Sequence, residues 1–317
     1  MKKIVTVYFG DDWNKEIPIT SEHTRISFED WHRSGIENGI EMYRASILWY
    51  DKKTKSFSKA WAFRNGSWIK VEESIRPDMI FDKIAGKHDF ELFDLKVEIS
   101  KTTKVFNHPL FRTLLDNKLE QYLLFNEYMP TSFMAENQKQ LISLNEKIKS
   151  EKVVIKPLYG SGGVGIFIGE KEEAEKQKFE YPVLMQEFIK SENGVPGFSQ
   201  QNEVSDLRLV YMNHKLIFAL SRIAKDGSLF TNFHQGASAV LVPEDKIPAS
   251  AHKIAENIIK KLSVFSQAQY SLDFIFTNEG KPILVEINTT PGFDLLYIVG
   301  DEDIKQKNFK EFAKLVD

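Results

Sequence analysis

Residues 270–292 read YSLDFIFTNEGKPILVEINTTPG, and this stretch carries the most specific signal in the chain. Apolar residues dominate 270–276 and 282–288, which predicts two strands. Asn278-Glu279-Gly280 lies between them and supplies the glycine that a tight turn needs. The stretch therefore predicts an antiparallel hairpin that closes the core of the fold.

Polar side chains on this hairpin form a candidate metal site. Asp273 lies on the first strand, and Glu286 and Asn288 lie two residues apart on the second, so that this pair shares a face. Counting across the turn brings Asp273 close to the pair. Two carboxylates and an amide oxygen on apolar strands suit a hard cation, Mg²⁺ or Mn²⁺. The alternative is that these residues only cap two strand ends.

The composition narrows the possible chemistry. The chain has 317 residues, with 42 Lys and Arg against 45 Asp and Glu, which gives a net charge of −3. This near-balance argues against a protein that wraps nucleic acid, and the length indicates about two domains. The absence of cysteine excludes disulfides, thiolate zinc sites, iron–sulfur clusters and cysteine nucleophiles.

The N-terminal stretch and the hydropathy of the chain predict where the protein works. Two lysines and a short apolar run precede Gly10 and Asp11-Asp12, which is too short for a signal peptide. No later apolar run reaches transmembrane length. We expect a cytoplasmic protein that does not bind membranes.

Residues 160–165 read GSGGVG and match the pattern G-x-G-x-x-G. The dinucleotide-binding form of this pattern requires a helix directly after the loop, whereas a strand is predicted at 166–168. The strand–loop–strand order is also that of protein kinases, but the downstream kinase motifs are absent. The remaining interpretation is a glycine hairpin whose backbone N–H groups approach phosphate oxygens, with a plain flexible hairpin as the alternative.

Several polar residues elsewhere lie where apolar strands are predicted. Lys156 lies in the strand that enters the glycine loop, where its charge needs a partner such as a phosphate. Asp206 and Arg208 lie two apart on one strand, and Arg222 lies on the next, which indicates an anionic ligand between them. The end of another buried strand can offer backbone groups to an adenine edge; it comprises Gln186, Glu187, Phe188 and Ile189.

The remaining chain alternates between sheet and helix signals. A strand at 3–9 opens a region that is β-rich to about residue 85, with a hairpin at 60–71 that turns at Asn65-Gly66. Helices are predicted at 109–126 and 136–150. The tryptophans of the N-terminal region are more typical of sheet core than of a binding surface: Trp31, Trp49, Trp61 and Trp68.

Taken together, these segments resemble the ATP-grasp superfamily in its carboxylate–amine ligase branch, of the glutathione synthetase and ribosomal-protein glutamate ligase type. The resemblance covers about residues 107–295. The segments that carry it occur in the family's order: Lys118, Val154 to Pro157, the loop 160–165, Gln186 to Ile189, Asp206 to Arg208, Ser221-Arg222, Asn232 to Gly236, Asp273 and Glu286 to Gly292.

The resemblance implies roles for these residues. Lys118 and Lys156 would bind the α- and β-phosphates of ATP, and Asp206 would lie near the ribose. Arg208 and Arg222 would neutralise the transferring phosphoryl group, and Asn232 would contact the acceptor or the acyl phosphate. The loop residues Ser161, Gly162 and Gly163 would close over the phosphates, Gln186 to Ile189 would meet the adenine, and Asp273, Glu286 and Asn288 would hold Mg²⁺.

The implied fold is α+β, with two ATP-grasp subdomains that grip ATP after an α/β N-terminal domain. We expect an N-terminal substrate domain over 1–106, a small subdomain with the glycine loop over 107–190, and a subdomain with the metal site over 191–317. The implied activity is ATP-dependent amide formation between a small-molecule or peptide carboxylate and an amine, by a chain that could form homo-oligomers. An ATP-grasp kinase and a non-catalytic ATP-binding regulator are the alternatives.

Overall fold

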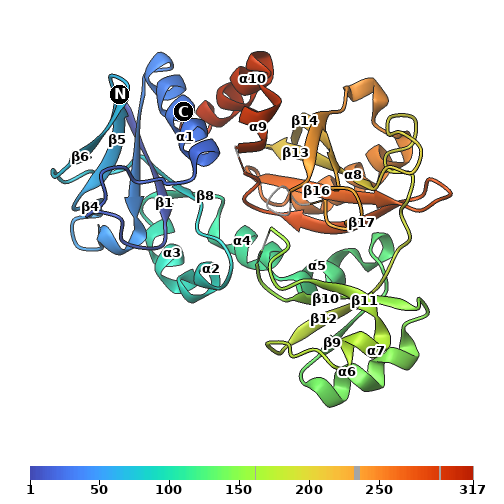
Figure 1. Cartoon of the computed structure of the whole chain (residues 1–317). Helices are drawn as coiled ribbons and strands as arrows, with labels where there is room; N and C mark the ends of the chain where they lie inside the picture. The colour runs from blue at the N-terminus through green and yellow to red at the C-terminus, as the bar shows by residue number, and fades with distance from the viewer. Residues whose placement is uncertain (161, 232–235, 293, 317) are drawn as a thin grey trace.

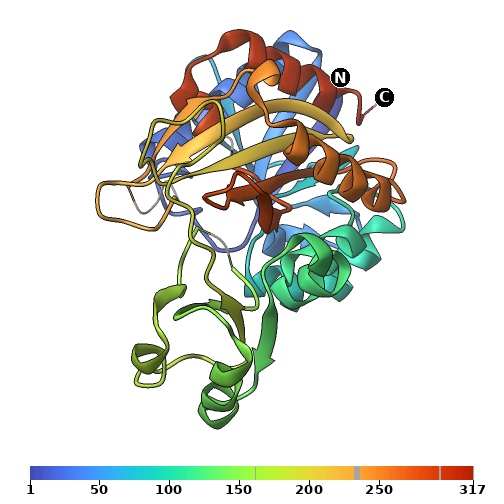
Figure 2. The same ribbon diagram turned by 90° about the vertical axis from the view of Figure 1, so that its right-hand side faces the viewer.

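The computed structural model describes residues 1–160, 162–231, 236–292 and 294–316. These residues form three main sheets: six strands in the N-terminal part, four in the middle and five in the C-terminal part (Figure 1). Turned by 90°, the molecule shows the four-stranded sheet projecting from the rest (Figure 2). This arrangement of sheets and helices confirms the predicted α+β class.

The N-terminal sheet has the strand order β6-β5-β2-β1-β7-β8. β1 pairs in parallel with β2 and β7, and β7 pairs in parallel with β8, as in an α/β domain. The six strands have these bounds: β1 Lys2–Tyr8, β2 Ile40–Ser46, β5 Ala60–Arg64, β6 Ser67–Val71, β7 Met79–Asp82 and β8 Lys104–Phe106. Two short strands, β3 Tyr50–Asp51 and β4 Ser56–Phe57, form a separate pair.

This part of the chain contains more helix than the sequence indicates. Helix α1 (Glu22–Glu37) connects β1 to β2, and helices α2 (Lys87–Glu91) and α3 (Phe93–Ser100) connect β7 to β8. The prediction of a β-rich region to residue 85 is therefore wrong for α1. Phe28 and Trp31 gave that segment the aromatic content of a strand, but both side chains pack into a core from a helix.

The hairpin prediction at residues 60–71 is confirmed. Asn65 and Gly66 have φ of 53° and 79°, which are the two left-handed positions of a type I′ turn between β5 and β6. The core interpretation of the tryptophans also holds, because Trp31, Trp49 and Trp61 are buried and Trp68 packs against the core.

The helix predicted at 109–126 is broken into α4 (Pro109–Asp116) and α5 (Lys118–Phe125). Asn117 has an extended backbone, with ψ of 119°, and its side chain caps α5 by accepting from the N–H of Leu119. The N–H of Lys118 donates to the carbonyl of Leu158, just before the glycine loop, at 2.9 Å. The break therefore pins Lys118 beside that loop.

The four-stranded sheet has the order β11-β10-β12-β9 and is antiparallel. Helix α6 (Gln138–Leu144) is followed by a 3-10 turn (Asn145–Lys147), so the helix is shorter than the predicted 136–150. The remaining elements of this part have these bounds: β9 Ser132–Ala135, β10 Lys152–Pro157, β11 Phe167–Glu170, α7 Lys171–Ala174 and β12 Val183–Glu187. The glycine loop connects β10 to β11.

The five-stranded sheet has the order β15-β14-β13-β16-β17, with antiparallel neighbours throughout. Helix α8 packs on one face and shares its core with residues of α4 and α5. These elements have the following bounds: β13 Ser205–Met212, β14 Lys215–Ile223, β15 Ser238–Leu241, α8 Ala249–Leu262, β16 Gln269–Phe276 and β17 Pro282–Asn288. Strand β17 forms one edge of this sheet.

The C-terminal helices α9 (Asp294–Val299) and α10 (Glu302–Ala313) return to the N-terminal sheet. The rings of Phe309 and Phe312 contact Trp31 of α1, with centroids 4.7 and 4.8 Å away. The first and last elements of the chain therefore share one core. Within the described ranges, no helix is both long and apolar enough to cross a bilayer.

Candidate functional site

The hairpin of β16 and β17 brings the predicted metal residues together. Asp273 lies directly opposite Glu286 in the register of the two strands, and Asn288 lies opposite Ser271. Side chains at opposed positions of an antiparallel pair lie on the same face. The predicted proximity of Asp273 to Glu286 and Asn288 is therefore confirmed by the register.

Asp273 has two arginine partners, which neighbouring strands supply. Arg208 on β13 holds the carboxylate with two hydrogen bonds, of 2.8 Å from Nε and 2.6 Å from Nη2. Arg222 on β14 donates from Nη2 to Asp273 Oδ2 at 2.8 Å. Burial alone would raise the pKa of Asp273, but these two guanidinium groups outweigh it and lower the pKa to about 2.

Arg222 also holds Asp206, which completes a buried group that we call the site cluster: Asp206, Arg208, Arg222 and Asp273. Arg222 Nε donates to Asp206 Oδ1 at 2.8 Å, and the hydroxyl of Thr231 donates to Asp206 Oδ2 at 2.7 Å. Burial and the nearby Asp273 raise the pKa of Asp206 against the effect of Arg222. The two arginines are thus oriented by carboxylates, whereas their sequence predicted an anionic ligand as the partner.

Two lysines approach the same hairpin from the other side. Lys118 Nζ lies 3.3 Å from Glu286 Oε1 and donates to the carbonyl of Gly160 at 2.6 Å. Lys156 Nζ donates to the carbonyl of Val285 at 3.2 Å. Burial lowers the pKa of Lys156 to about 8, although Glu286 opposes this shift. Both ammonium groups therefore lie beside Glu286 or the strand that carries it, where they could also meet a phosphate.

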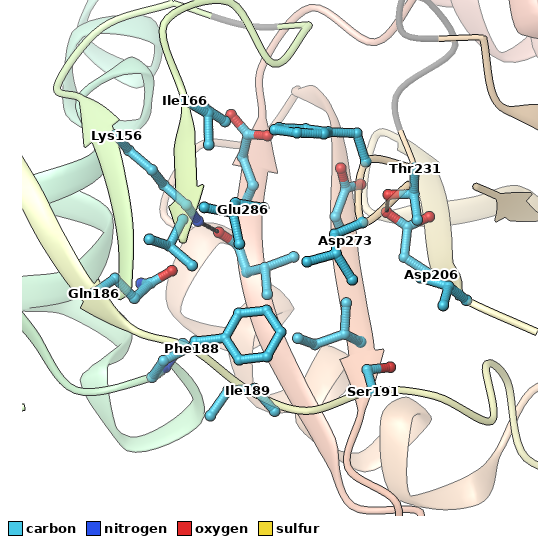
Figure 3. Close-up of a pocket in the computed structure, with 18 of the residues that line it drawn as sticks. Lys156, Ile166, Gln186, Phe188, Ile189, Ser191, Asp206, Thr231, Asp273 and Glu286 are labelled. Atoms are coloured by element: carbon cyan, nitrogen blue, oxygen red, sulfur yellow. Dashed lines mark hydrogen bonds between the residues drawn. The ribbon is translucent and has the colours of Figure 1, made fainter. Parts of the chain in front are cut away.

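A pocket lies between the four-stranded and five-stranded sheets. Figure 3 shows Lys156, Gln186 and Phe188 on one wall and Asp206, Thr231 and Asp273 on the opposite wall. Its lining unites residues predicted separately from the sequence: Lys156, Gln186, Glu187, Phe188, Ile189, Asp206, Arg222, Asp273 and Glu286. A concave site with apolar walls and converging charged groups is typical of a small-molecule site.

The end of β12 offers specific hydrogen-bonding groups to this pocket. The N–H of Glu187 already donates to the carbonyl of Thr131 at 2.9 Å, and the N–H of Phe188 donates to the hydroxyl of Ser150 at 3.0 Å. Gln186 is buried, and its side-chain amide donates to Ser132 at 2.9 Å. The carbonyl of Glu187 and the backbone beyond it are therefore the groups that a ligand could contact.

The glycine loop has the backbone conformation that only glycine adopts readily. Gly162 and Gly163 have φ of 72° and 78°, so that a side chain at either position would be strained. Two residues of the predicted site, Ser161 of this loop and Asn232, lie outside the described residues.

A comparison with protein families identifies the family of the chain. A model of the RimK-like ATP-grasp domain matches residues 117–308, more than half of the chain. The chain belongs to this family. The match begins at the cap of α5 and includes the glycine loop, the site cluster and the β16–β17 hairpin.

Relatives and solved structures are similar to this ATP-grasp chain in different degrees. A probable alpha-L-glutamate ligase of Hydrogenovibrio crunogenus is 28% identical over 185 residues, which cover 56% of this chain and 55% of that protein. The chain thus spans about half the length of the curated relatives it matches.

Two solved ATP-grasp structures match nearly the whole fold. A RiPP-associated ligase of Chryseobacterium gregarium, in complex with ADP and a leader and core peptide, has a TM-score of 0.62, with 100% of this chain and 96% of that chain covered at 16% identity. The ligase PsnB, complexed with a precursor variant, Mg and ADP, also has a TM-score of 0.62, with 99% and 98% covered at 12% identity. At such identities the likeness establishes the fold alone.

The residues of this ATP-grasp domain fit a divalent cation in their chemistry. Glu286 and Asn288 carry hard oxygen donors on one face, and the side chain of Glu286 is 21% exposed. Asp273 is engaged by two arginines, and the Asn288 amide oxygen accepts from the N–H of Thr290 at 2.8 Å, so Glu286 is the more accessible donor. In the described part of the chain, no three His, Cys, Asp or Glu side chains gather as metal ligands. A divalent cation bound here would therefore draw on the Asn288 amide oxygen and on oxygens of a bound phosphate as well as on carboxylates.

Three residues hold the end of β17 without any signal in the sequence: Asn107 and Gln121, which are buried, and Asp116, which is partly buried. Asn107, Asp116 and Gln121 each reach the segment 287–289 through a side-chain hydrogen bond. Asp116 and Gln121 belong to a stretch that reads as an amphipathic helix, where polar residues are normally solvent-exposed. No feature of the sequence marks Gln121, one turn after Lys118, as buried.

Proposed function

We propose that this chain is an ATP-dependent carboxylate–amine ligase that forms an amide bond and releases ADP and phosphate. One observation carries the proposal: Lys156, Asp273 and Glu286 line a single pocket of an ATP-grasp domain, and Lys118 Nζ lies 3.3 Å from Glu286 Oε1. Two cations and two anions in this arrangement suit a polyphosphate bound together with a divalent metal. The proposed reaction needs no protein side chain as a covalent nucleophile, because the substrate carboxylate attacks the phosphate directly.

The pocket would hold ATP along its length. The backbone at Glu187 and Ile189 would meet the adenine edge, and Phe188 supports that end of the pocket. Asp206 lies on the opposite wall and would face the ribose. Lys118 and Lys156 would bind the α- and β-phosphates, while Ser161, Gly162 and Gly163 would close over them.

Glu286, Asn288 and Asp273 would hold Mg²⁺ or Mn²⁺. When bound, the ion would neutralise charge on the β- and γ-phosphate oxygens and hold them for in-line transfer. Glu286 already lies 3.3 Å from Lys118, so metal and phosphate would meet at the same carboxylate.

The reaction has two balanced steps. A carboxylate oxygen of the substrate attacks the γ-phosphorus, the bond to the β,γ-bridging oxygen breaks, and ADP leaves with that electron pair. A neutral amine then attacks the acyl carbon of the acyl phosphate, loses a proton and expels inorganic phosphate. Arg208 and Arg222, fixed by Asp206 and Asp273, would stabilise charge in both steps, and Asn232 would contact the acceptor.

The substrate class is a free amino acid, a small peptide or a side chain of a peptide. The solved structures with leader, core or precursor peptides match this chain over nearly its full length, including residues 1–106. The glutamate ligase relative matches only about half of the chain. We propose that residues 1–106 form the part that binds substrate.

The test is to incubate the purified full chain with ATP, Mg²⁺ and pooled amino acids or peptides, and to follow phosphate release and new masses. A ligase releases stoichiometric phosphate only when acid and amine are both present, and a product appears whose mass equals the two substrates less water. A phosphorylated product without an amine requirement would indicate a kinase. Nucleotide binding without turnover across the pools would indicate a regulatory protein, and no Mg²⁺-dependent binding of adenine nucleotides would overturn the assignment.

A further inference from the structure

Strand β17 carries two of the proposed metal residues, and it is the edge of its sheet. An edge strand leaves every second residue with a backbone N–H and C=O that have no strand beside them. At Ile287 both groups are hydrogen-bonded to the side chain of Gln121. Gln121 Nε2 donates to the carbonyl of Ile287 at 2.9 Å, and the N–H of Ile287 donates to Gln121 Oε1 at 2.8 Å. One side-chain amide therefore replaces a neighbouring strand at this point.

Gln121 is itself rigidly held. Its side chain is 2% exposed, and Nε2 also donates to the carbonyl of Leu115 at 2.6 Å. It lies on α5 one turn after Lys118, and that helix begins at the Asn117 cap. The same short helix thus places an ammonium group next to Glu286 and an amide against the backbone of the following residue.

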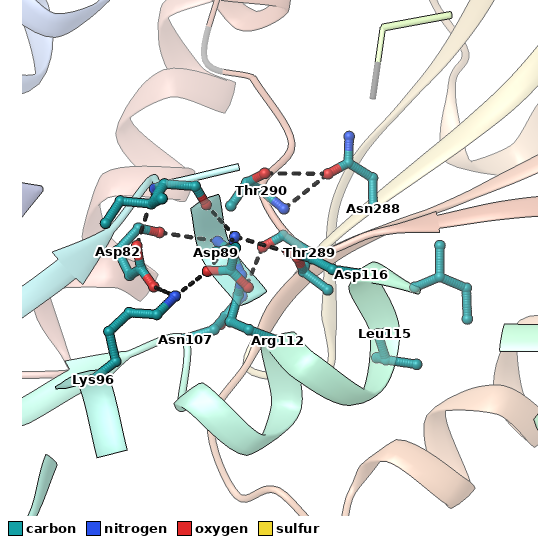
Figure 4. Close-up of polar contacts among 12 residues, drawn as sticks. Asp82, Asp89, Lys96, Asn107, Arg112, Leu115, Asp116, Asn288, Thr289 and Thr290 are labelled. Atoms are coloured by element: carbon teal, nitrogen blue, oxygen red, sulfur yellow. Dashed lines mark hydrogen bonds and ion pairs between the residues drawn. The ribbon is translucent and has the colours of Figure 1, made fainter. Parts of the chain in front are cut away.

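Thr289, two residues after Ile287, is also held by hydrogen bonds from side chains outside the strand (Figure 4). Its carbonyl accepts from Asn107 Nδ2 at 2.8 Å, and its hydroxyl donates to Asp116. The strand end is therefore held at Ile287 and Thr289, while Glu286 and Asn288 alternate with them and face the other way. A shift of one residue along the strand would move both oxygen donors out of the site.

Resting on the proposed function, we infer that Gln121 is a positioning residue for the metal site. It touches neither phosphate nor metal, and it acts by fixing the backbone between Glu286 and Asn288. Its removal would leave the two donors free to drift apart, which weakens metal binding more than nucleotide binding. Residues that orient metal ligands in this indirect way are commonly worth about 10–100-fold in metal affinity or activity.

The test compares Gln121→Met with a matched variant, Gln138→Met. Gln138 also bridges two segments, since Nε2 donates to the carbonyl of Glu175 and Oε1 accepts from Tyr181, but it lies in the four-stranded part away from the hairpin. For each protein, binding of a fluorescent ATP analogue is titrated against Mg²⁺, and phosphate release is measured with the substrates found for the wild type. Thermal unfolding is recorded in parallel.

We expect Gln121→Met to raise the Mg²⁺ concentration at half-saturation by about tenfold or more. The KM for ATP at saturating Mg²⁺ should change by less than about threefold. Gln138→Met should lower thermal stability comparably and leave the Mg²⁺ titration unchanged. An unchanged Mg²⁺ titration in Gln121→Met would overturn the inference while leaving the ligase assignment intact, and a wild type without Mg²⁺-dependent binding would overturn both.

A second variant covers the case in which Gln121→Met does not fold. Gln121→Glu keeps the acceptor for the N–H of Ile287 but puts a carboxylate oxygen against the carbonyls of Leu115 and Ile287. We expect the same direction of change in the Mg²⁺ titration at neutral pH. A Mg²⁺ titration of Gln121→Glu that matches the wild type would contradict the positioning role.

Discussion

Two charge clusters lie in the interior of the protein, and they differ in charge balance and in access to the pocket. The site cluster has two arginines and two aspartates. The second group, which we call the junction cluster, connects the end of β7 and the α2–α3 segment to α4 (Figure 4). It has three acidic and two basic residues: Asp82, Asp89, Lys96, Arg112 and Asp116.

The ion pairs of the junction cluster are enclosed except at Asp116, whose side chain is 18% exposed. Lys96 Nζ lies 2.8 Å from Asp82 and also contacts Asp89, while Arg112 Nη2 lies 3.1 Å from Asp89 and 3.0 Å from Asp116. Arg112 is fully buried and also donates to the carbonyls of Asp82 and Ile84. In the site cluster, by contrast, Asp206, Arg222 and Asp273 all line the pocket.

The charge balance of each cluster is reflected in the pKa of one of its carboxyl groups. Asp273 faces two arginines, and its pKa falls to about 2. Burial raises the pKa of Asp89 to about 7, and Asp82 and Asp116 add to that shift against Arg112 and Lys96. The site cluster thus exposes paired charges to the pocket, where a ligand could contact them. The junction cluster instead joins α2 and α3 to α4, and it contains more acidic than basic side chains. Mutations should therefore separate activity from stability.

The largest expected effect is on stability, in Arg112→Met. The substitution leaves Asp89 and Asp116 without their shared cation in a buried place, which typically costs about 3–5 kcal/mol. We expect the free energy of unfolding, measured by denaturant titration, to fall by that amount. Arg33→Met removes an arginine whose side chain is 50% exposed and should cost less than about 1 kcal/mol. Equal losses in both variants would remove the distinction between the clusters.

The second expected effect is on activity, in Glu286→Gln. The amide keeps the shape of the side chain but loses the charge that faces Lys118 and would face the metal. Phosphate release should fall by about 100-fold or more, which corresponds to about 2.7 kcal/mol of transition-state stabilisation. Unfolding should change by less than about 1 kcal/mol, because this side chain is partly exposed. Glu279→Gln in the exposed turn of the same hairpin is the control, and normal turnover in Glu286→Gln would refute the metal assignment.

The contrast also explains how much the sequence could predict. Counting across the short turn brings Asp273 close to Glu286 but would pair it with Val285; a register shift between Asp273 and Phe274, which the sequence did not predict, places Glu286 directly opposite. The pairing of Arg208 and Arg222 with Asp273 could not be read in this way. It depends on β13 lying between β14 and β16, and it joins residues about 50 to 70 positions apart in sequence.

Helices α4 and α5 show a second feature that the sequence could not predict, the position where a helical stretch breaks. The apolar spacing over 109–126 correctly indicated helix, but the break at Asn117 depends on a hydrogen bond from Lys118 to Leu158, in another element. Propensity alone does not distinguish an asparagine that caps from one that is solvent-exposed within a helix. The roles of Gln121 and Asp116 could not be predicted from the sequence either. Their shielding from solvent, nearly complete for Gln121 and partial for Asp116, comes from the sheet that packs against the helices.

A smaller effect is expected in the pH dependence of stability, and it tests the excess of acidic residues in the junction cluster. The folded chain holds a proton on Asp89 up to about pH 7, whereas the unfolded chain loses it near pH 4. Because the folded state binds that proton more tightly, this group makes stability fall as pH rises from about 4 to 7 and contributes no further change above that range. Asp89→Asn should therefore lose less stability than the wild type between pH 5 and pH 7.5. Denaturant titrations at both pH values measure this, with the exposed Asp94→Asn as a control that should parallel the wild type.

The smallest effect tests whether a change at the junction cluster alters the proposed metal site. Thr289 donates its hydroxyl to Asp116 of the junction cluster and directly follows Asn288 of the metal site. Thr289→Val keeps the shape and removes this hydrogen bond, which should lower the free energy of unfolding by about 1 kcal/mol. Because Gln121 and Asn107 still hold the strand end, phosphate release and its Mg²⁺ dependence should change by less than about threefold. If Thr289→Val instead shifted the Mg²⁺ titration as strongly as Gln121→Met, the junction cluster would help to set the metal site, and the division between a stabilising and a ligand-binding cluster would not hold.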